Sequence, residues 1–201
     1  MFTAHAMWGL SAGLLSFGAY LLYARSILSR RTKPSLVTWG IWSVLLTFTA
    51  ASYLAVGAHE TFWFSMGNAL GAIVCGVLAF KTGRWIWTPL DFFALLGALL
   101  GIGIWAYANS PFAALAAFIA ADFMGALPTL YKAAKNPSTE ELFPWGITAA
   151  ASVLGLLAVR FWSTEIALYP LYMALTNLSI FALLLRGTTF RQVISRQYSD
   201  A

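Results

Sequence analysis

The sequence predicts an all-α membrane protein with seven transmembrane helices, arranged as two triple-helix bundles joined by a linker helix. Three observations predict it. Of the 201 residues, 60% are hydrophobic and only 9% are charged, whereas a soluble domain carries about 25% charged residues. Long stretches lack Asp, Glu, Lys and Arg, and short motifs recur in the two halves of the chain. This composition excludes an ordinary soluble enzyme, a disordered chain and a nucleic-acid-binding module, despite the net charge of +5.

The stretches without charged residues give the helices in order. A bilayer core needs about 20 apolar helical residues. The stretch 92–121 is too long for one span and is divided at Asn109-Ser110-Pro111, a turn signal with a proline suited to begin the next helix. The expected helices cover residues 5–28, 35–57, 61–81, 89–107, 111–134, 143–163 and 166–186.

The basic residues give the expected orientation. With seven spans, eleven of the twelve Lys and Arg residues lie on one side of the membrane, and Arg160 lies on the other. Cytoplasmic loops carry an excess of basic residues. We therefore expect the N-terminus outside, the C-terminus in the cytoplasm and a short cytoplasmic tail over residues 188–201. The expected location is the bacterial inner (cytoplasmic) membrane.

Two triplets of helices share sequence features. Trp39-Gly40-Ile41 lies near the start of the second helix and Trp145-Gly146-Ile147 near the start of the sixth, each after a basic segment with a Pro-Ser pair. The fourth helix has no counterpart. A parallel repeat related by an axis along the membrane normal fits this pattern. It predicts a first bundle over residues 1–84, a linker helix over 85–109 and a second bundle over 110–187.

The third and seventh helices each carry a mid-span asparagine, Asn68 and Asn177. Tyr53 and Trp162 lie 15 residues before them. A buried amide costs several kcal/mol in hydrocarbon unless it is hydrogen-bonded. Two amides from matching helices facing one cavity would suit an uncharged polar solute. The alternatives are interhelical hydrogen bonding for the asparagines and interface anchoring for the aromatic residues.

One segment resembles a known superfamily. Leu127-Pro128-Thr129-Leu130-Tyr131-Lys132, followed by Asn136-Pro137-Ser138, resembles the signature of the PQ-loop superfamily, which includes the SWEET sugar transporters. The resemblance covers roughly residues 8–81 and 111–186. It implies seven helices, an outside N-terminus, a central pocket between the triplets and alternating access. It also implies that Asn68, Asn177, Tyr53 and Trp162 line this pocket as substrate-binding residues.

Asp122 is the one acidic residue deep inside an expected span, about 17 Å into the fifth helix at 1.5 Å per residue. An intramembrane carboxyl group is a candidate for proton coupling or solute selection; a structural hydrogen bond is the alternative. Pro128 removes a backbone hydrogen bond from the same helix. Together with Gly125 it forms a candidate hinge, for which a static kink is the alternative.

The expected function is transport of a small polar solute, sugar-like or amino-acid-like, by alternating access, with proton coupling left open. We expect no enzymatic activity, no cofactor and no metal site. The single cysteine, Cys75, excludes a cysteine cluster for metal. The expected partners are the solute and membrane lipid but not nucleic acid, and a homo-oligomer is left open. The alternatives are a non-transporting membrane scaffold or receptor and a small intramembrane enzyme.

Overall fold

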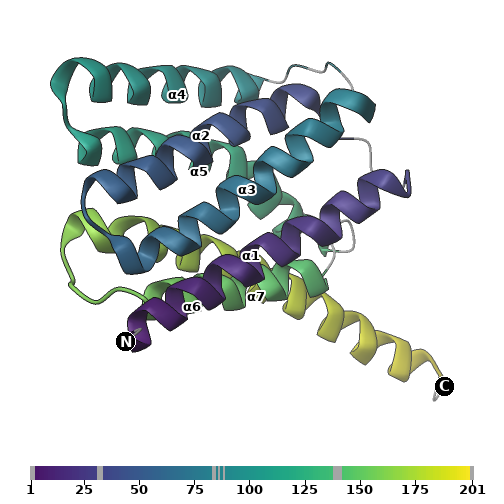
Figure 1. Ribbon diagram of the computed structural model, residues 1–201. Coiled ribbons are helices and arrows are strands. Elements are labelled where there is room, and N and C mark those ends of the chain that lie inside the picture. Colours follow the sequence, from purple (N-terminus) through teal and green to yellow (C-terminus); the bar gives the residue numbers. More distant parts are fainter. Residues whose placement is uncertain are drawn as a thin grey trace.

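The computed structural model describes residues 3–30, 34–82, 85, 87, 89–137 and 142–199, with the backbone alone described at 90, 128, 132 and 188–199. Within these ranges the chain forms helices and no strand (Figure 1). The helices are α1 (Ala4–Leu28), α2 (Leu36–Ala55), α3 (His59–Thr82), α4 (Pro89–Ala108), α5 (Pro111–Lys135), α6 (Leu142–Leu157) and α7 (Thr164–Ser199).

The expected all-helical fold is confirmed, and five of the seven helices have bounds within two residues of those expected. The sixth and seventh helices differ. The helix α6 ends at Leu157, because the next six residues form a turn and an irregular connection. The helix α7 continues to Ser199, so its backbone is helical through residues expected to form the tail.

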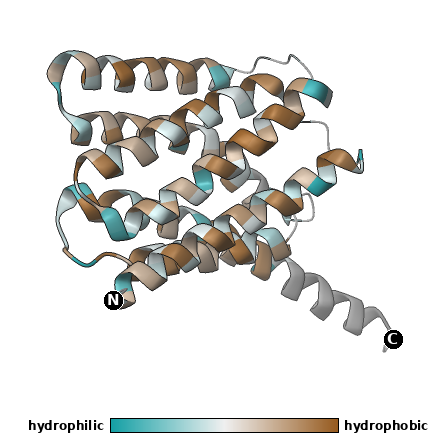
Figure 2. Cartoon of the chain, viewed as in Figure 1, coloured by the Kyte–Doolittle hydropathy of each residue, from teal (hydrophilic) through white to brown (hydrophobic). Residues whose placement is uncertain are grey.

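Six of the helices are long and apolar enough to cross a membrane, and α6 is a shorter apolar helix. Large hydrophobic side chains lie exposed on the outer faces, among them Leu14, Phe80, Leu99 and Leu175. Figure 2 shows hydrophobic residues along the described length of the helices. Such faces are unfavourable in water and favourable in lipid. These are the features of an integral membrane protein.

The helices pack in a regular order. The helix α3 packs against both α1 and α2, and α7 packs against both α5 and α6. Between these two groups, α1 packs against α6 and α2 packs against α5. Exchanging α1, α2 and α3 for α5, α6 and α7 therefore maps these contacts onto one another. The helix α4 stands outside this scheme and packs against α5 and α2 (Figure 1).

Successive helices run in alternating directions, so the molecule has two distinct ends (Figure 1). We call one the basic end: there α2, α4 and α6 begin, and Arg25, Lys81, Lys135 and Arg186 lie on the helices that run toward it. The other is the N-terminal end, with the connections α2–α3, α4–α5 and α6–α7. Gly57 has a φ of 74°, which glycine adopts without strain. It allows the α2–α3 connection to reverse the chain direction within three residues.

Glycines let α1 and α3 approach closely. A Cβ atom added to Gly67 would overlap the carbonyl oxygen of Gly13, and one added to Gly13 would overlap that of Trp63. Without side chains at these positions, the two backbones come into direct contact. Membrane helices associate through this kind of close packing, because lipid gives them no hydrophobic reason to pair.

Gly67→Ala should lower the melting temperature of the detergent-solubilised protein, because the new methyl group would push α1 away from α3. Over-packing of this kind costs about 1–3 kcal/mol. Gly18→Ala is the matched control, since nothing lies within 4 Å of a Cβ atom added there. Equal melting temperatures for the two variants, measured by intrinsic fluorescence, would contradict this account of the packing.

Candidate functional site

A cavity of about 650 Å³ lies between the two groups of helices. Small-molecule sites in proteins commonly enclose about 300–1,000 Å³. The wall is partly polar and partly aromatic, and α1, α2, α3, α5, α6 and α7 all contribute to it. The lining includes the aromatic and polar residues Tyr20, Tyr23, Thr38, Trp39, Trp42, Asn68, Asp91, Asp122, Thr129, Trp145, Thr148, Tyr172, Thr176 and Asn177, together with Gly125 and Pro144.

The lining residues of the two groups correspond by position. Three on α1, Ala19, Tyr20 and Tyr23, are matched on α5 by Gly125, Ala126 and Thr129, each 106 positions further along. The same spacing of 106 relates three of the four lining residues of α2, Thr38, Trp39 and Trp42, to Pro144, Trp145 and Thr148 of α6. Equivalent positions of the two groups therefore face one shared space.

Each asparagine is anchored through its amide nitrogen. Asn68 is fully buried, and its Nδ2 donates to the carbonyl oxygen of Phe64 at 2.9 Å and to Ser16 Oγ at 3.5 Å. Asn177 Nδ2 donates to Ser152 Oγ at 2.7 Å. The Ser152 hydroxyl itself donates to the carbonyl oxygen of Thr148, so its oxygen must accept from Asn177. Both amide orientations are thereby fixed.

These anchors leave the amide oxygens available. Asn68 Oδ1 is buried and has no hydrogen-bond partner within the part of the chain that the structure describes. An unsatisfied buried acceptor costs about 1–3 kcal/mol. A ligand with a hydrogen-bond donor would offset this cost. Both asparagines thus make interhelical hydrogen bonds through nitrogen, and both residues line the cavity.

Asp122 also has a single hydrogen-bond partner among the described residues. The Tyr172 hydroxyl of α7 donates to its Oδ2 at 2.6 Å, a short bond typical of a charge-assisted pair. The Oδ1 atom accepts no described hydrogen bond. Because Asp122 and Tyr172 both line the cavity, this carboxyl group can meet a bound solute.

Four aromatic residues form a connected wall on the side of α1 and α2. The ring centroids of Tyr23 and Trp39 are 5.0 Å apart, those of Trp39 and Trp42 are 5.5 Å apart, and those of Tyr20 and Trp39 are 6.0 Å apart. The Tyr20 ring lies directly against Gly71 of α3, where a Cβ atom would overlap it. Because Gly71 has no side chain, the Tyr20 ring can pack directly against the backbone of α3.

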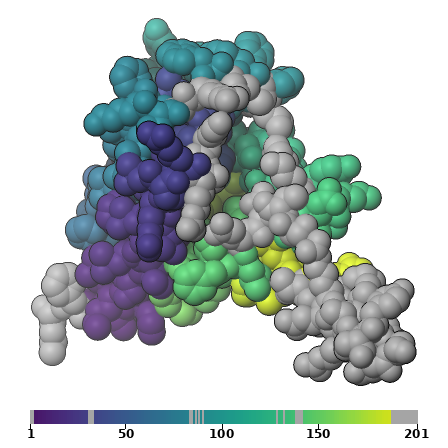
Figure 3. Space-filling view, turned by 90° about the vertical axis from the view of Figure 1, so that its right-hand side faces the viewer, coloured from purple at the N-terminus to yellow at the C-terminus, as the bar shows by residue number. Residues whose placement is uncertain are grey.

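The cavity extends to the basic end of the molecule. Pro34 and Ser35, just before α2, line it together with Pro144 and Trp145 in the first turn of α6. Asp91, in the first turn of α4, lines it too and accepts a hydrogen bond from the Thr38 hydroxyl at 2.7 Å. Figure 3 views this end, with α1 in purple and helices of the second group in green.

At the N-terminal end, buried aromatic residues from both groups of helices fill the space. Tyr53 of α2, Phe64 of α3 and Tyr169 of α7 belong to one buried cluster. The Tyr169 ring lies 5.8 Å from Tyr53 and 5.7 Å from Phe64, centroid to centroid. Phe64 also packs against Gly155 of α6, where a Cβ atom would come within 2.6 Å of its ring. We call Tyr53, Phe64 and Tyr169 the aromatic seal.

A proline explains the position of Tyr53. Pro170 lies inside α7 and has no N–H group, so the carbonyl oxygen of Ile166 loses its usual helical donor. The Tyr53 hydroxyl donates to that oxygen at 2.8 Å and accepts from the backbone N–H of Tyr169 at 3.3 Å. The side chain from α2 thus satisfies the interrupted backbone of α7.

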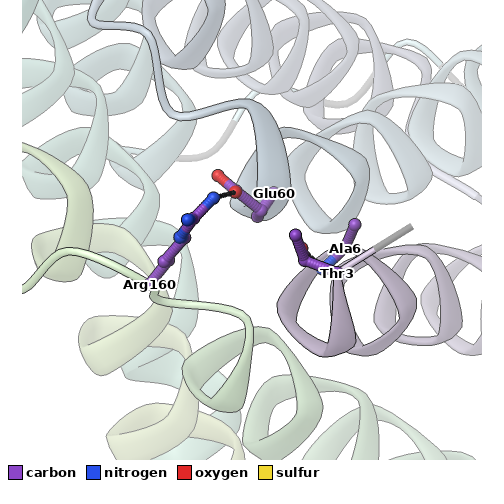
Figure 4. A network of polar contacts seen from close by, with 4 residues as sticks. All are labelled: Thr3, Ala6, Glu60 and Arg160. Atoms are coloured by element: carbon purple, nitrogen blue, oxygen red, sulfur yellow. Dashed lines mark hydrogen bonds and ion pairs between the residues drawn. The ribbon is translucent and has the colours of Figure 1, made fainter. Parts of the chain in front are cut away.

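An ion pair lies at the same end (Figure 4). Arg160, in the connection between α6 and α7, contacts Glu60 in the first turn of α3, with 3.5 Å between Nη1 and Oε1. The two side chains are 46% and 21% exposed. An exposed pair contributes about 0–1 kcal/mol, so it links the two groups of helices only weakly.

The structure brings four predicted site residues together. Asn68, Asn177, Asp122 and Gly125 all line the cavity. Gly125 faces Trp42, since a Cβ atom added to Gly125 would lie 2.9 Å from the Nε1 atom of Trp42. The backbone at Pro128 belongs to α5, but the side chain that was expected to form the hinge lies outside the described residues.

Tyr53 and Trp162 are not among the residues that line the cavity, which corrects the placement expected for them. Tyr53 is fully buried in the aromatic seal, and Trp162 is 68% exposed in the connection after α6. Trp162 lies in the connection because α6 ends at Leu157, whereas Tyr53 lies within α2. The spacing of 106 matches Tyr53 to Val159 rather than to Trp162.

Sequence reasoning missed the aromatic wall and Tyr172. Trp39 and Trp145 were recognised as markers of the repeat but not as lining residues. The spacing of 106 relates Tyr20, Tyr23 and Trp42 to Ala126, Thr129 and Thr148, but it does not show which residues face a cavity. No sequence signal joins Tyr172 to Asp122, because the two lie 50 positions apart on different helices.

No group of three or more His, Cys, Asp or Glu side chains arranged to hold a metal ion occurs among the described residues. Comparisons with protein-family models, with curated proteins and with solved structures give no match to this chain. The resemblance to the PQ-loop superfamily therefore stays a prediction.

Tyr53→Phe should destabilise the detergent-solubilised protein by about 1–3 kcal/mol, because it leaves the Ile166 carbonyl oxygen buried without a donor. Tyr107→Phe is the matched control, since Tyr107 is 94% exposed. The melting temperature is the measurement. If the two variants melt together with the parent, the hydroxyl of Tyr53 does not support α7.

Proposed function

We propose that this chain is a membrane carrier that moves a small polar solute by alternating access. The observation that carries the proposal is the cavity of about 650 Å³ between the two groups of helices, which reaches the basic end while the aromatic seal fills the N-terminal end. A carrier needs a polar site that is accessible from one side at a time. The cavity and the seal together meet that requirement in one conformation.

We further propose that the two groups of helices are the halves of a parallel repeat, with α4 as the linker. The spacing of 106 between lining residues and the matching helix contacts support it. The resemblance to the PQ-loop superfamily suggests the same arrangement. With the N-terminus outside, the basic end is cytoplasmic, and the conformation described here is the inward-facing one, in the bacterial inner membrane.

A rocking motion of the two halves about the cavity would close the basic end and open the N-terminal end. At the N-terminal end the halves are held by the Glu60–Arg160 ion pair and by the Tyr53 hydrogen bonds to α7. Such interactions contribute about 1 kcal/mol each, so thermal motion can break them. Asp122 stands at the centre of this exchange, where it would select the solute or couple its movement to a proton.

Reconstituted into proteoliposomes, the parent protein should take up at least one radiolabelled compound from a panel of sugars, amino acids and amines in a saturable manner. Asn177→Ala and Asp122→Asn should each reduce that uptake about tenfold or more, because each removes a polar group of the cavity worth about 1.5 kcal/mol. Glu165→Gln, which alters an exposed acid at the start of α7, is the control.

Two outcomes would contradict the proposal. If the cavity variants transport every solute as the parent does, the cavity is not the transport site. If the folded parent takes up nothing from the panel, a non-transporting scaffold or receptor becomes the better interpretation.

A further inference from the structure

Three residues of the cavity lining each carry an acceptor oxygen that takes no hydrogen bond from the described part of the chain. Asn68 uses its amide nitrogen for Phe64 and Ser16, and Asn177 uses one of its two N–H groups for Ser152, so each keeps its amide oxygen. The Oδ1 atom of Asp122 accepts no hydrogen bond from a described residue. A ligand that matches these atoms must present several N–H or O–H donors from a compact group.

The charged side chains that line the cavity are acidic within the part of the chain that the structure describes. Asp122 and Asp91 line the cavity, and no Lys, Arg or His does so among the described residues. Asp122 receives a hydrogen bond from the neutral hydroxyl of Tyr172 but no described cation lies against it. A carboxylate held between membrane helices is expensive unless a cation or hydrogen bonds compensate it. A cationic ligand would supply that compensation.

The aromatic wall stands beside this carboxylate. Asp122 and Gly125 are three residues apart and share one face of α5, and the indole nitrogen of Trp42 would lie 2.9 Å from a Cβ atom added to Gly125. Trp42 is joined to Trp39, Tyr20 and Tyr23 by the ring contacts described above. The faces of Trp and Tyr rings attract cations, and clusters of them bind alkylammonium groups.

From this juxtaposition we propose that the cavity binds a primary ammonium ion attached to a small aromatic or branched alkyl group. The ammonium group donates to Asp122 and to the asparagine oxygens, and the apolar part packs on the wall of Tyr20, Tyr23, Trp39 and Trp42. This inference rests on the proposed carrier function and narrows its solute from a polar molecule to an organic cation. An anion is excluded by Asp122, and a neutral sugar leaves its charge uncompensated.

Isothermal titration calorimetry on the full chain in lipid nanodiscs tests the inference with two probes of the same shape. These are 2-phenylethylammonium and the neutral 2-phenylethanol. The parent should bind the ammonium probe about tenfold or more tightly than the alcohol, as expected for a hydrogen bond to a charged group. Asp122→Asn should abolish this preference. Asp122→Glu should retain it, and Glu165→Gln should match the parent.

Equal affinities of the folded parent for the two probes would overturn the inference, as would binding of neither probe. It would also fall if Asp122→Asn kept the full preference while eluting as a monodisperse, helical protein. Retention of the preference by Asp122→Glu separates loss of charge from loss of structure, because that variant keeps the carboxylate.

Uptake of the same ammonium probe by proteoliposomes separates this inference from the proposed function. Selective binding with no uptake would overturn the carrier and leave the cation site standing. Saturable uptake of a neutral sugar that is unchanged in Asp122→Asn would leave the carrier standing and overturn the cation site.

Discussion

A polar side chain between membrane helices needs a hydrogen-bond partner, because hydrocarbon supplies none. This constraint explains why the polar residues of this chain gather where they do. Asn68 and Asn177 reach serines on neighbouring helices, and Asp122 reaches Tyr172. Each pair ties one helix to another, and Asn68, Asn177 and Asp122 all line the same cavity. The packing within each group of helices and the polar lining of the cavity therefore depend on the same few hydrogen bonds.

The two ends of the molecule differ in how firmly they are closed. Aromatic rings fill the N-terminal end, but the seal is not fully satisfied. Ser52 Oγ and the hydroxyl of Tyr169 are buried without a hydrogen-bond partner among the described residues. Each such group costs about 1–3 kcal/mol while it stays dry. Opening this end would admit water to them, which offsets part of the lost ring packing. In the proposed carrier, this would ease the change to the opposite conformation.

Much of the fold could be predicted from the sequence, because hydrocarbon imposes long charge-free stretches and turn residues separate them. The same logic identified Asp122, Asn68 and Asn177, whose polarity is unusual in a span. It failed for Tyr53, whose place depends on a carbonyl oxygen freed by Pro170, far away on α7. It failed for Trp162 because α6 ends at Leu157, which leaves this residue in the exposed connection before α7. The aromatic wall was not predicted, since aromatic residues are common throughout this chain and only the packing shows which of them face the cavity.

The central claim is that the cavity is reached from each side of the membrane in turn. Thr176 lines it midway along the apolar span Thr164–Gly187 of α7, and Cys75 is the only native cysteine. Thr176→Cys in a Cys75→Ala background therefore provides a single reporter for a membrane-impermeant maleimide, added to right-side-out or inside-out vesicles. The account predicts alkylation from both faces, rapid from the basic end and slower but measurable from the N-terminal end. Complete protection from the N-terminal end, while the basic end reacts to completion, would contradict it.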